Sequence, residues 1–117
     1  MHNREKGKLG EEIAAKYLIG KGYRIVERNW NCRWGELDII ASKGDTTVFV
    51  EVKYRTSLQY GEPEYSVHFK KYTHMIRTIQ MFLSKHRHAG SRWRIDVITV
   101  LKTDSSYLIK HYTGLYR

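Results

Sequence analysis

Asp38, Glu51 and Lys53 are the residues of this 117-residue chain whose types and spacing could carry out chemistry. Asp38 lies in one apolar run, residues 35–41, and the other two lie in the next, residues 46–55. Alternate side chains of a strand share a face, so Glu51 and Lys53 point the same way. A hairpin between the two runs would bring Asp38 beside them, which gives a cluster of two carboxylates and one ammonium.

Such a cluster is suited to the hydrolysis of a phosphodiester. The reaction builds negative charge on the phosphoryl oxygens, and a divalent cation neutralises that charge and acidifies the attacking water. Magnesium prefers oxygen ligands and usually takes one or two carboxylates from the protein. We therefore expect Asp38 and Glu51 to bind one or two Mg²⁺ or Mn²⁺ ions. Lys53 would hydrogen-bond the attacking water or stabilise the transition state.

The same residues have a plainer interpretation. Asp38 would be a satisfied polar group at a strand end, and Glu51 and Lys53 would form an ion pair on an exposed sheet face. Phe49 shares that face, and valines alternate with these residues on the other. A carboxylate and an ammonium in so apolar a strand cost free energy unless they have a function, which favours the catalytic interpretation.

The surrounding pattern predicts two helices and five strands. An apolar stripe at helical spacing indicates a helix over 7–20, and a second helix is expected over 66–86. The expected strands are 23–30, 35–41, 46–55, 93–101 and 107–112, and the expected loop is 56–64. The order α-β-β-β-α-β-β predicts an α/β fold, with a central mixed sheet flanked by helices. The length favours one domain over residues 1–117.

The charge distribution points to a polyanionic partner. The net charge is +9 with a pI near 9.7, and no acidic residue occurs between Tyr65 and Ile95. The alternative is a solvated basic face that only keeps the protein soluble. The candidate contacts to nucleic-acid phosphates are Arg55, Lys70, Lys71, Arg77, Arg92 and Arg94.

Several other classes of protein are disfavoured. No apolar run is long enough to span a membrane, and the first residues do not read as a secretory signal, so we expect a cytoplasmic protein without membrane contact. Cys32 is the only cysteine, which excludes an internal disulfide and a cysteine-rich zinc site.

Ordered motifs along nearly the whole chain indicate a family. These are Gly7-x-x-Gly10-Glu11-x-x-Ala14, Gly35-Glu36-Leu37-Asp38, Val50-Glu51-Val52-Lys53-x-Arg55 and Arg94-Ile95-Asp96-Val97. The Asp, hairpin, Glu-x-Lys core resembles the PD-(D/E)XK nucleases, the restriction-endonuclease-like superfamily. The full set resembles the YraN family of small bacterial proteins, which is similar to archaeal Holliday-junction resolvases. The end of the chain from His111 matches the family poorly.

This resemblance implies a restriction-endonuclease-like fold and a metal-dependent endodeoxyribonuclease, with branched or structured DNA as a substrate. It also implies that Glu11 joins the metal site as a further catalytic residue, because related nucleases carry a helix glutamate there. Glu11 can also be read as an ordinary first-turn glutamate favoured by the helix dipole. Glu36 shares strand parity with Asp38 and is expected to support the site.

Other functions stay open at this point. One is a non-catalytic nucleic-acid-binding adaptor that retains a nuclease fold, and a weaker one is a binder of RNA or ribosomes. A homodimer would suit a two-fold DNA junction, although the sequence indicates no dimer interface. Aromatic residues near the active strand could stack on unpaired bases or simply complete the core or its rim: Trp34, Tyr54, Tyr60 and Tyr65.

Overall fold

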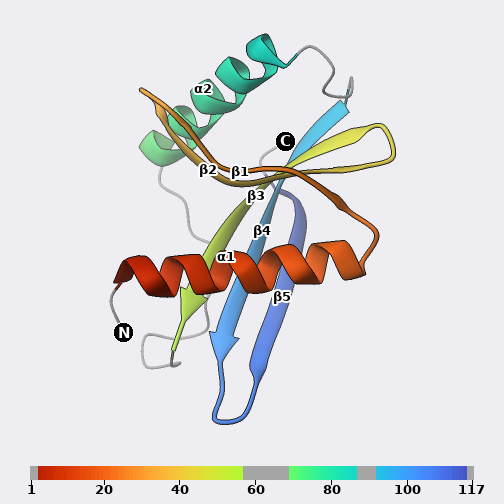
Figure 1. Ribbon diagram of the computed structural model, residues 1–117. Helices are drawn as coiled ribbons and strands as arrows, with labels where there is room; N and C mark the ends of the chain where they lie inside the picture. Colours follow the sequence, from red (N-terminus) through yellow and green to blue (C-terminus); the bar gives the residue numbers. More distant parts are fainter. Residues whose placement is uncertain (1–2, 57–68, 87–91, 116–117) are drawn as a thin grey trace.

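The elements of the fold follow the predicted order. The computed structural model describes residues 3–56, 69–86 and 92–115. Its helices and strands are α1 (Asn3–Gly20), β1 (Arg24–Cys32), β2 (Gly35–Lys43), β3 (Thr46–Arg55), α2 (Phe69–Lys85), β4 (Arg92–Lys102) and β5 (Tyr107–Leu115) (Figure 1). The α/β class and the α-β-β-β-α-β-β order are therefore confirmed.

The boundaries differ from the prediction at a few ends. Helix α1 begins at Asn3 rather than residue 7, and β5 continues to Leu115 rather than ending at residue 112. The predicted loop over 56–64 lies outside the described residues except for residue 56, and so do residues 66–68 of the expected second helix. No helix in the described ranges has the length and apolarity that crossing a bilayer requires.

The five strands form one mixed sheet in the order β1-β2-β3-β4-β5. Strands β3 and β4 are parallel, and the other neighbouring pairs are antiparallel. A parallel pair needs a crossover, and α2 lies in the segment that connects β3 to β4. Strand β3, which carries Glu51 and Lys53, is thus the centre of the sheet.

The two faces of β3 are covered by different helices. On one face Val48 and Val50 pack in a core with Ala14 and Leu18 of α1. On the other face Phe49 packs in a second core with Phe82 of α2 and its neighbours. Figure 1 shows α1 lying across the strands and α2 packed near β1 and β2. Strand alternation therefore places Glu51 and Lys53 on the α2 side of β3.

Gly10 lets α1 approach β3 closely. The residue is buried, and a Cβ atom at position 10 would lie 3.0 Å from the Cβ of Tyr54 and 3.3 Å from its Cδ2. Such a contact is too short for most side chains, so the absence of a side chain sets the spacing between helix and sheet. Glu11 follows directly, and this spacing determines how near its carboxylate comes to the sheet.

A substitution at position 10 should therefore destabilise the protein far more than the same change one helical turn earlier. Gly7 is exposed, and a Cβ atom at position 7 would meet no other atom within 4 Å, so Gly7→Leu is the matched control with the same gain in helix propensity. We expect Gly10→Leu to be about 1–3 kcal/mol less stable than Gly7→Leu, the usual cost of overpacking. Urea unfolding of the two variants measures this difference, and equal midpoints would contradict the close packing.

Candidate active site

The pairing of β2 with β3 stops just before the predicted site. The last paired residues are Ile39 and Val50. Beyond that point the backbone N–H of Val52 donates a hydrogen bond of 2.9 Å to Oδ2 of Asp38. The Asp38 side chain thus replaces a backbone partner where the strands diverge, and this bond fixes the orientation of its carboxylate.

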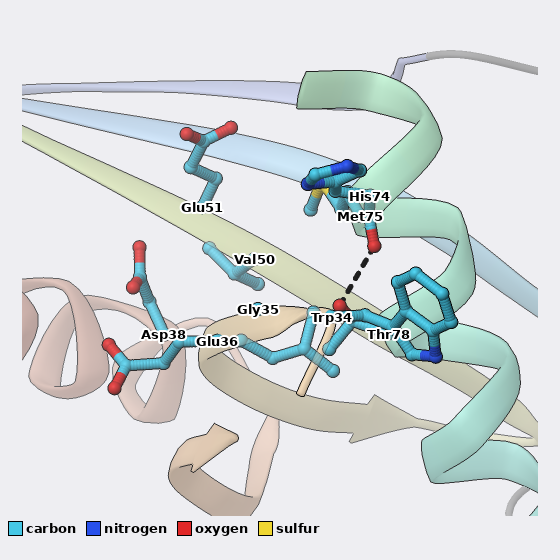
Figure 2. A pocket seen from close by; sticks show the side chains of 10 residues that line it. Trp34, Gly35, Glu36, Asp38, Val50, Glu51, His74, Met75 and Thr78 are labelled. Atoms are coloured by element: carbon cyan, nitrogen blue, oxygen red, sulfur yellow. Dashed lines mark hydrogen bonds between the residues drawn. The ribbon is translucent and has the colours of Figure 1, made fainter. Parts of the chain in front are cut away.

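Asp38 and Glu51 line the same pocket. Its volume is about 280 Å³, and its walls come from β2, β3, α2 and the turn before β2. The lining residues are Trp34, Gly35, Glu36, Leu37, Asp38, Val50, Glu51, His74, Met75 and Thr78. Figure 2 shows the carboxylates of Glu36, Asp38 and Glu51 gathered on one side of the pocket, away from the side chains of α2. The hairpin therefore brings Asp38 and Glu51 to one place, as strand alternation indicates.

Three carboxylates are close enough to hold one cation. One oxygen from each of Glu11, Glu36 and Asp38 lies within 4.8 Å of the other two. Helix α1 supplies Glu11, and β2 supplies the other two. Oxygen donors of this kind suit a hard divalent ion such as Mg²⁺ or Mn²⁺. Glu36 was expected only to support the site, and its place in this group follows from the strand parity that it shares with Asp38.

The electrostatics of the group favour a cation. Burial is the largest cause that raises the pKa of Asp38 to about 7, and the nearby carboxylates of Glu11, Glu51 and Glu36 contribute to this rise against the opposing hydrogen bond from Val52. Burial also raises the pKa of Glu11, with a further contribution from Glu36. Negative charges held this close repel one another, and a bound divalent ion would remove that cost.

Asn29 holds Glu11 in place and was not predicted from the sequence. Its backbone has a φ of 54°, in the left-handed region that asparagine tolerates better than most residues. The pairs on either side of it, Arg28 with Ile39 and Trp30 with Leu37, place Asn29 across from Asp38. A hydrogen bond from its side chain to Glu11 lowers the pKa of that carboxylate and so partly offsets the effect of burial.

Glu51 and Lys53 form a partly buried ion pair. The Nζ atom of Lys53 lies 3.7 Å from Oε1 of Glu51, and the two side chains are 16% and 12% exposed. The pair is therefore not on an exposed sheet face, as the plainer interpretation required. Glu51 lies outside the three-carboxylate group, although its charge acts on Asp38. That Asp38 and Glu51 share an ion stays a prediction.

The predicted phosphate contacts are distributed unevenly. Arg55 and Arg92 are exposed at the ends of β3 and β4, and Arg77 is exposed on α2. Lys70 and Lys71 lie in the first turn of α2, and their side chains are outside the described part of the structure. DNA contacts from these residues stay predictions.

Arg94 belongs to a network of hydrogen bonds around Asp96. Its Nε and a terminal nitrogen donate to both oxygens of Asp96, at 3.0 and 3.3 Å, and the same nitrogen donates to the Tyr23 hydroxyl at 2.8 Å. Asp96 is fully buried. It also forms a hydrogen bond of 2.8 Å with Nε2 of His111 and accepts one of 2.9 Å from the backbone N–H of Gly114. These bonds use Nε and one terminal nitrogen of Arg94, and a phosphate contact from its other terminal nitrogen stays a prediction.

Comparisons with known proteins identify relatives from one family. The model of the uncharacterised protein family UPF0102 matches residues 10–100. A UPF0102 protein of Myxococcus xanthus is 37% identical over 97% of this chain and 90% of its own, and one of Alkaliphilus oremlandii is 43% identical over 97% and 99%. A UPF0102 protein of Syntrophus aciditrophicus is 47% identical over 84% of this chain and 77% of its own.

One solved structure has a distant likeness. The structure of Pyrococcus furiosus SfsA in complex with Ca²⁺ matches with a TM-score of 0.41 and 18% identity, over 94% of this chain and 63% of that chain. The sequence relatives are much closer, and they extend along most of both chains. The family match over residues 10–100 and these relatives show that the chain belongs to the UPF0102 family, in agreement with the YraN resemblance of its motifs.

Proposed function

We propose that this protein is a metal-dependent endodeoxyribonuclease. The observation that carries the proposal is the gathering of two sets of charged residues around one pocket, which Glu36, Asp38 and Glu51 line. The carboxylates of Glu11, Glu36 and Asp38 lie within 4.8 Å of one another, and the Glu51–Lys53 ion pair lies beside them. Acidic oxygen donors with an adjacent ammonium are what metal-assisted hydrolysis of a phosphodiester requires.

The donor set fits a divalent cation. Asp38, Glu11 and Glu36 would hold the ion, and Glu51 is close enough for its charge to act on Asp38. Bound there, Mg²⁺ or Mn²⁺ would neutralise charge on the phosphoryl oxygens and acidify a water molecule. We expect Glu51 to complete the site by turning from Lys53 toward the cation.

The protein residues have separate tasks in this proposal. Asp38 is oriented by the Val52 N–H, and Glu11 by Asn29, so neither carboxylate needs to reorganise when substrate binds. Lys53 holds its ammonium group 3.7 Å from Glu51, which lines the pocket. A fixed positive charge there stabilises the transition state more than the ground state.

The surface charge supplies the affinity for DNA. Arg55, Arg77 and Arg92 are exposed, and the chain carries a net charge of +9. Contacts of this kind bind phosphates without reading the base sequence, and they weaken as the salt concentration rises. A branched or structured substrate is suggested by the resemblance to resolvases alone.

A cleavage assay on purified protein tests the function. Linear duplex, single-stranded, flapped and four-way-junction DNA are incubated with Mg²⁺, Mn²⁺ or EDTA. We expect cutting with either metal and none with EDTA, with products that carry a 5′-phosphate. Protein that binds these DNAs but cuts none of them with either metal would contradict the proposal and favour the non-catalytic adaptor.

A further inference from the structure

A cluster of aromatic and cationic side chains lies across the pocket from the carboxylates. Its centre is Trp34, in the turn between β1 and β2. The guanidinium carbons of Arg33 and Arg77 lie 4.8 and 4.6 Å from the centre of the Trp34 ring, and the His74 ring lies 6.5 Å away. Figure 2 shows Trp34 and His74 toward α2, opposite Glu51 and the other carboxylates.

The turn that carries Trp34 is packed tightly on α2. Gly35 has a φ of 152°, and a Cβ atom there would lie 3.3 Å from Oγ1 of Thr78. The backbone N–H of Trp34 also donates to Sγ of Cys32 at 3.4 Å. These contacts fix the Trp34 backbone beside α2, so its indole forms a wall of the pocket.

The pocket thus has two chemically different sides. One side is acidic and fits a divalent cation that would bind a phosphate. The other presents an indole flanked by two guanidinium groups. A nucleotide has the same two parts, because its phosphate binds a metal and its base stacks on an aromatic ring. In a continuous duplex the base is held in the stack, so only an unpaired nucleotide could use both sides at once.

The interaction energies favour replacement of a guanidinium on the Trp34 ring by a base. An exposed cation–π contact is worth about 0.5–1 kcal/mol, whereas stacking a base on an aromatic side chain is worth about 1–3 kcal/mol. A base can therefore displace one guanidinium from the ring. The displaced arginine becomes available for a neighbouring phosphate.

We infer that this pocket binds an unpaired nucleotide of DNA, with the base on Trp34 and the phosphate toward the carboxylates. The inference rests on the proposed function of the acidic site and adds a substrate class to it, namely DNA with an unpaired nucleotide at the phosphate to be cut. Arg77 and Arg33 would bind the flanking phosphates.

A binding experiment separates this inference from cleavage. The Glu51→Gln protein, which should not cut, is titrated with Mg²⁺ present into fluorescently labelled single-stranded oligo-dT and into a blunt duplex of equal length. Adding Trp34→Ala should weaken oligo-dT binding roughly 5- to 150-fold, the value of one stacked base, and should change duplex binding by less than about twofold. Trp34→Phe should restore most of the affinity.

Two controls identify the interaction. Tyr107 is an exposed aromatic residue of β5 outside the pocket, so Tyr107→Ala should leave both affinities unchanged. An oligonucleotide with abasic sites throughout should lose the advantage that Trp34 gives, because its phosphates remain and its bases are absent.

A fluorescence measurement covers the case in which Trp34→Ala does not fold. With Trp30 and Trp93 replaced by Phe, Trp34 is the only tryptophan of the chain, and oligo-dT should quench its emission while the duplex should not. Equal effects on single strand and duplex, or no quenching, would overturn the inference even if the protein cuts DNA. The protein could also cut no DNA while Trp34→Ala weakens oligo-dT binding and oligo-dT quenches Trp34 emission. That result would support nucleotide binding in the pocket and reject only the nuclease activity.

Discussion

Glu51→Gln and Lys53→Ala should each lower the rate of metal-dependent DNA cleavage by about a hundredfold or more, with little loss of DNA affinity. Removing one charged group that stabilises a transition state commonly costs a factor of about 10²–10³. Both side chains are mostly buried, at 12% and 16% exposed, and they lie beside the acidic group rather than on the basic surface. The loss should therefore appear in the cleavage rate and not in binding.

The control variants lie on α1. Glu12→Gln removes an exposed carboxylate whose partner is Arg28, and Lys16→Ala removes an exposed ammonium. Both should cut at the wild-type rate in single-turnover assays with Mg²⁺. Because Glu51 and Lys53 act as a unit, the double variant should be little slower than either single variant. Cleavage by Glu51→Gln at the wild-type rate would remove Glu51 from the mechanism.

Asp38→Asn should remove a large part of the loss of stability that rising pH causes when no divalent metal is present. Burial and the surrounding carboxylates raise the pKa of Asp38 from 3.8 to about 7 in the folded protein. Between those values the folded state keeps a proton that the unfolded chain has lost, so the contribution of this group falls as pH rises and is lost above pH 7. A difference of about three pKa units corresponds to about 4 kcal/mol.

Asparagine does not titrate, and its carbonyl oxygen can still accept the hydrogen bond from Val52. Relative to wild type, the Asp38→Asn protein should therefore gain several kcal/mol in free energy of unfolding between pH 4 and pH 8 in EDTA. Denaturant unfolding at a series of pH values measures this difference. A constant difference across the range would show that Asp38 is not charged within a repulsive cluster.

Asp45→Asn is the control for this experiment, because Asp45 is exposed in the turn between β2 and β3. Its difference from wild type should stay within about 0.5 kcal/mol at every pH. Adding Mg²⁺ at pH 8 should stabilise the wild-type protein and the Asp45→Asn control, and it should have little effect on Asp38→Asn.

Periodicity and strand parity were enough to predict the frame of the site. The hairpin between 35–41 and 46–55 is local, and alternation alone put Glu51 and Lys53 together, which the ion pair shows. The resemblance added Glu11 from a distant helix. The structure places its carboxylate with those of Glu36 and Asp38 because Gly10 allows α1 to approach the sheet.

Other features depend on contacts that no local pattern encodes. The left-handed backbone of Asn29 and its bond to Glu11 require α1 and β1 to be docked first. Arg94 was predicted to face DNA because it lies in a basic segment, yet it turns inward to Asp96. Two partners of Asp96, His111 and Gly114, lie on β5, where the motifs matched poorly. The composition of a segment does not show whether a charged residue in it faces solvent or pairs with a buried partner.

The hydrogen bond between Val52 and Asp38 gives one oxygen of the Asp38 carboxylate a structural role and leaves the other oxygen for chemistry. Oδ2 closes the gap where the strands part, so the fold itself requires an acceptor at this position and does not require a charge. An amide meets the first requirement and fails the second. Under the proposed function, a change from aspartate to asparagine at this position would remove a metal ligand while the fold is kept. If the proposal holds, the residue aligned with Asp38 would therefore distinguish relatives that cut DNA from relatives that only bind it better than the fold does.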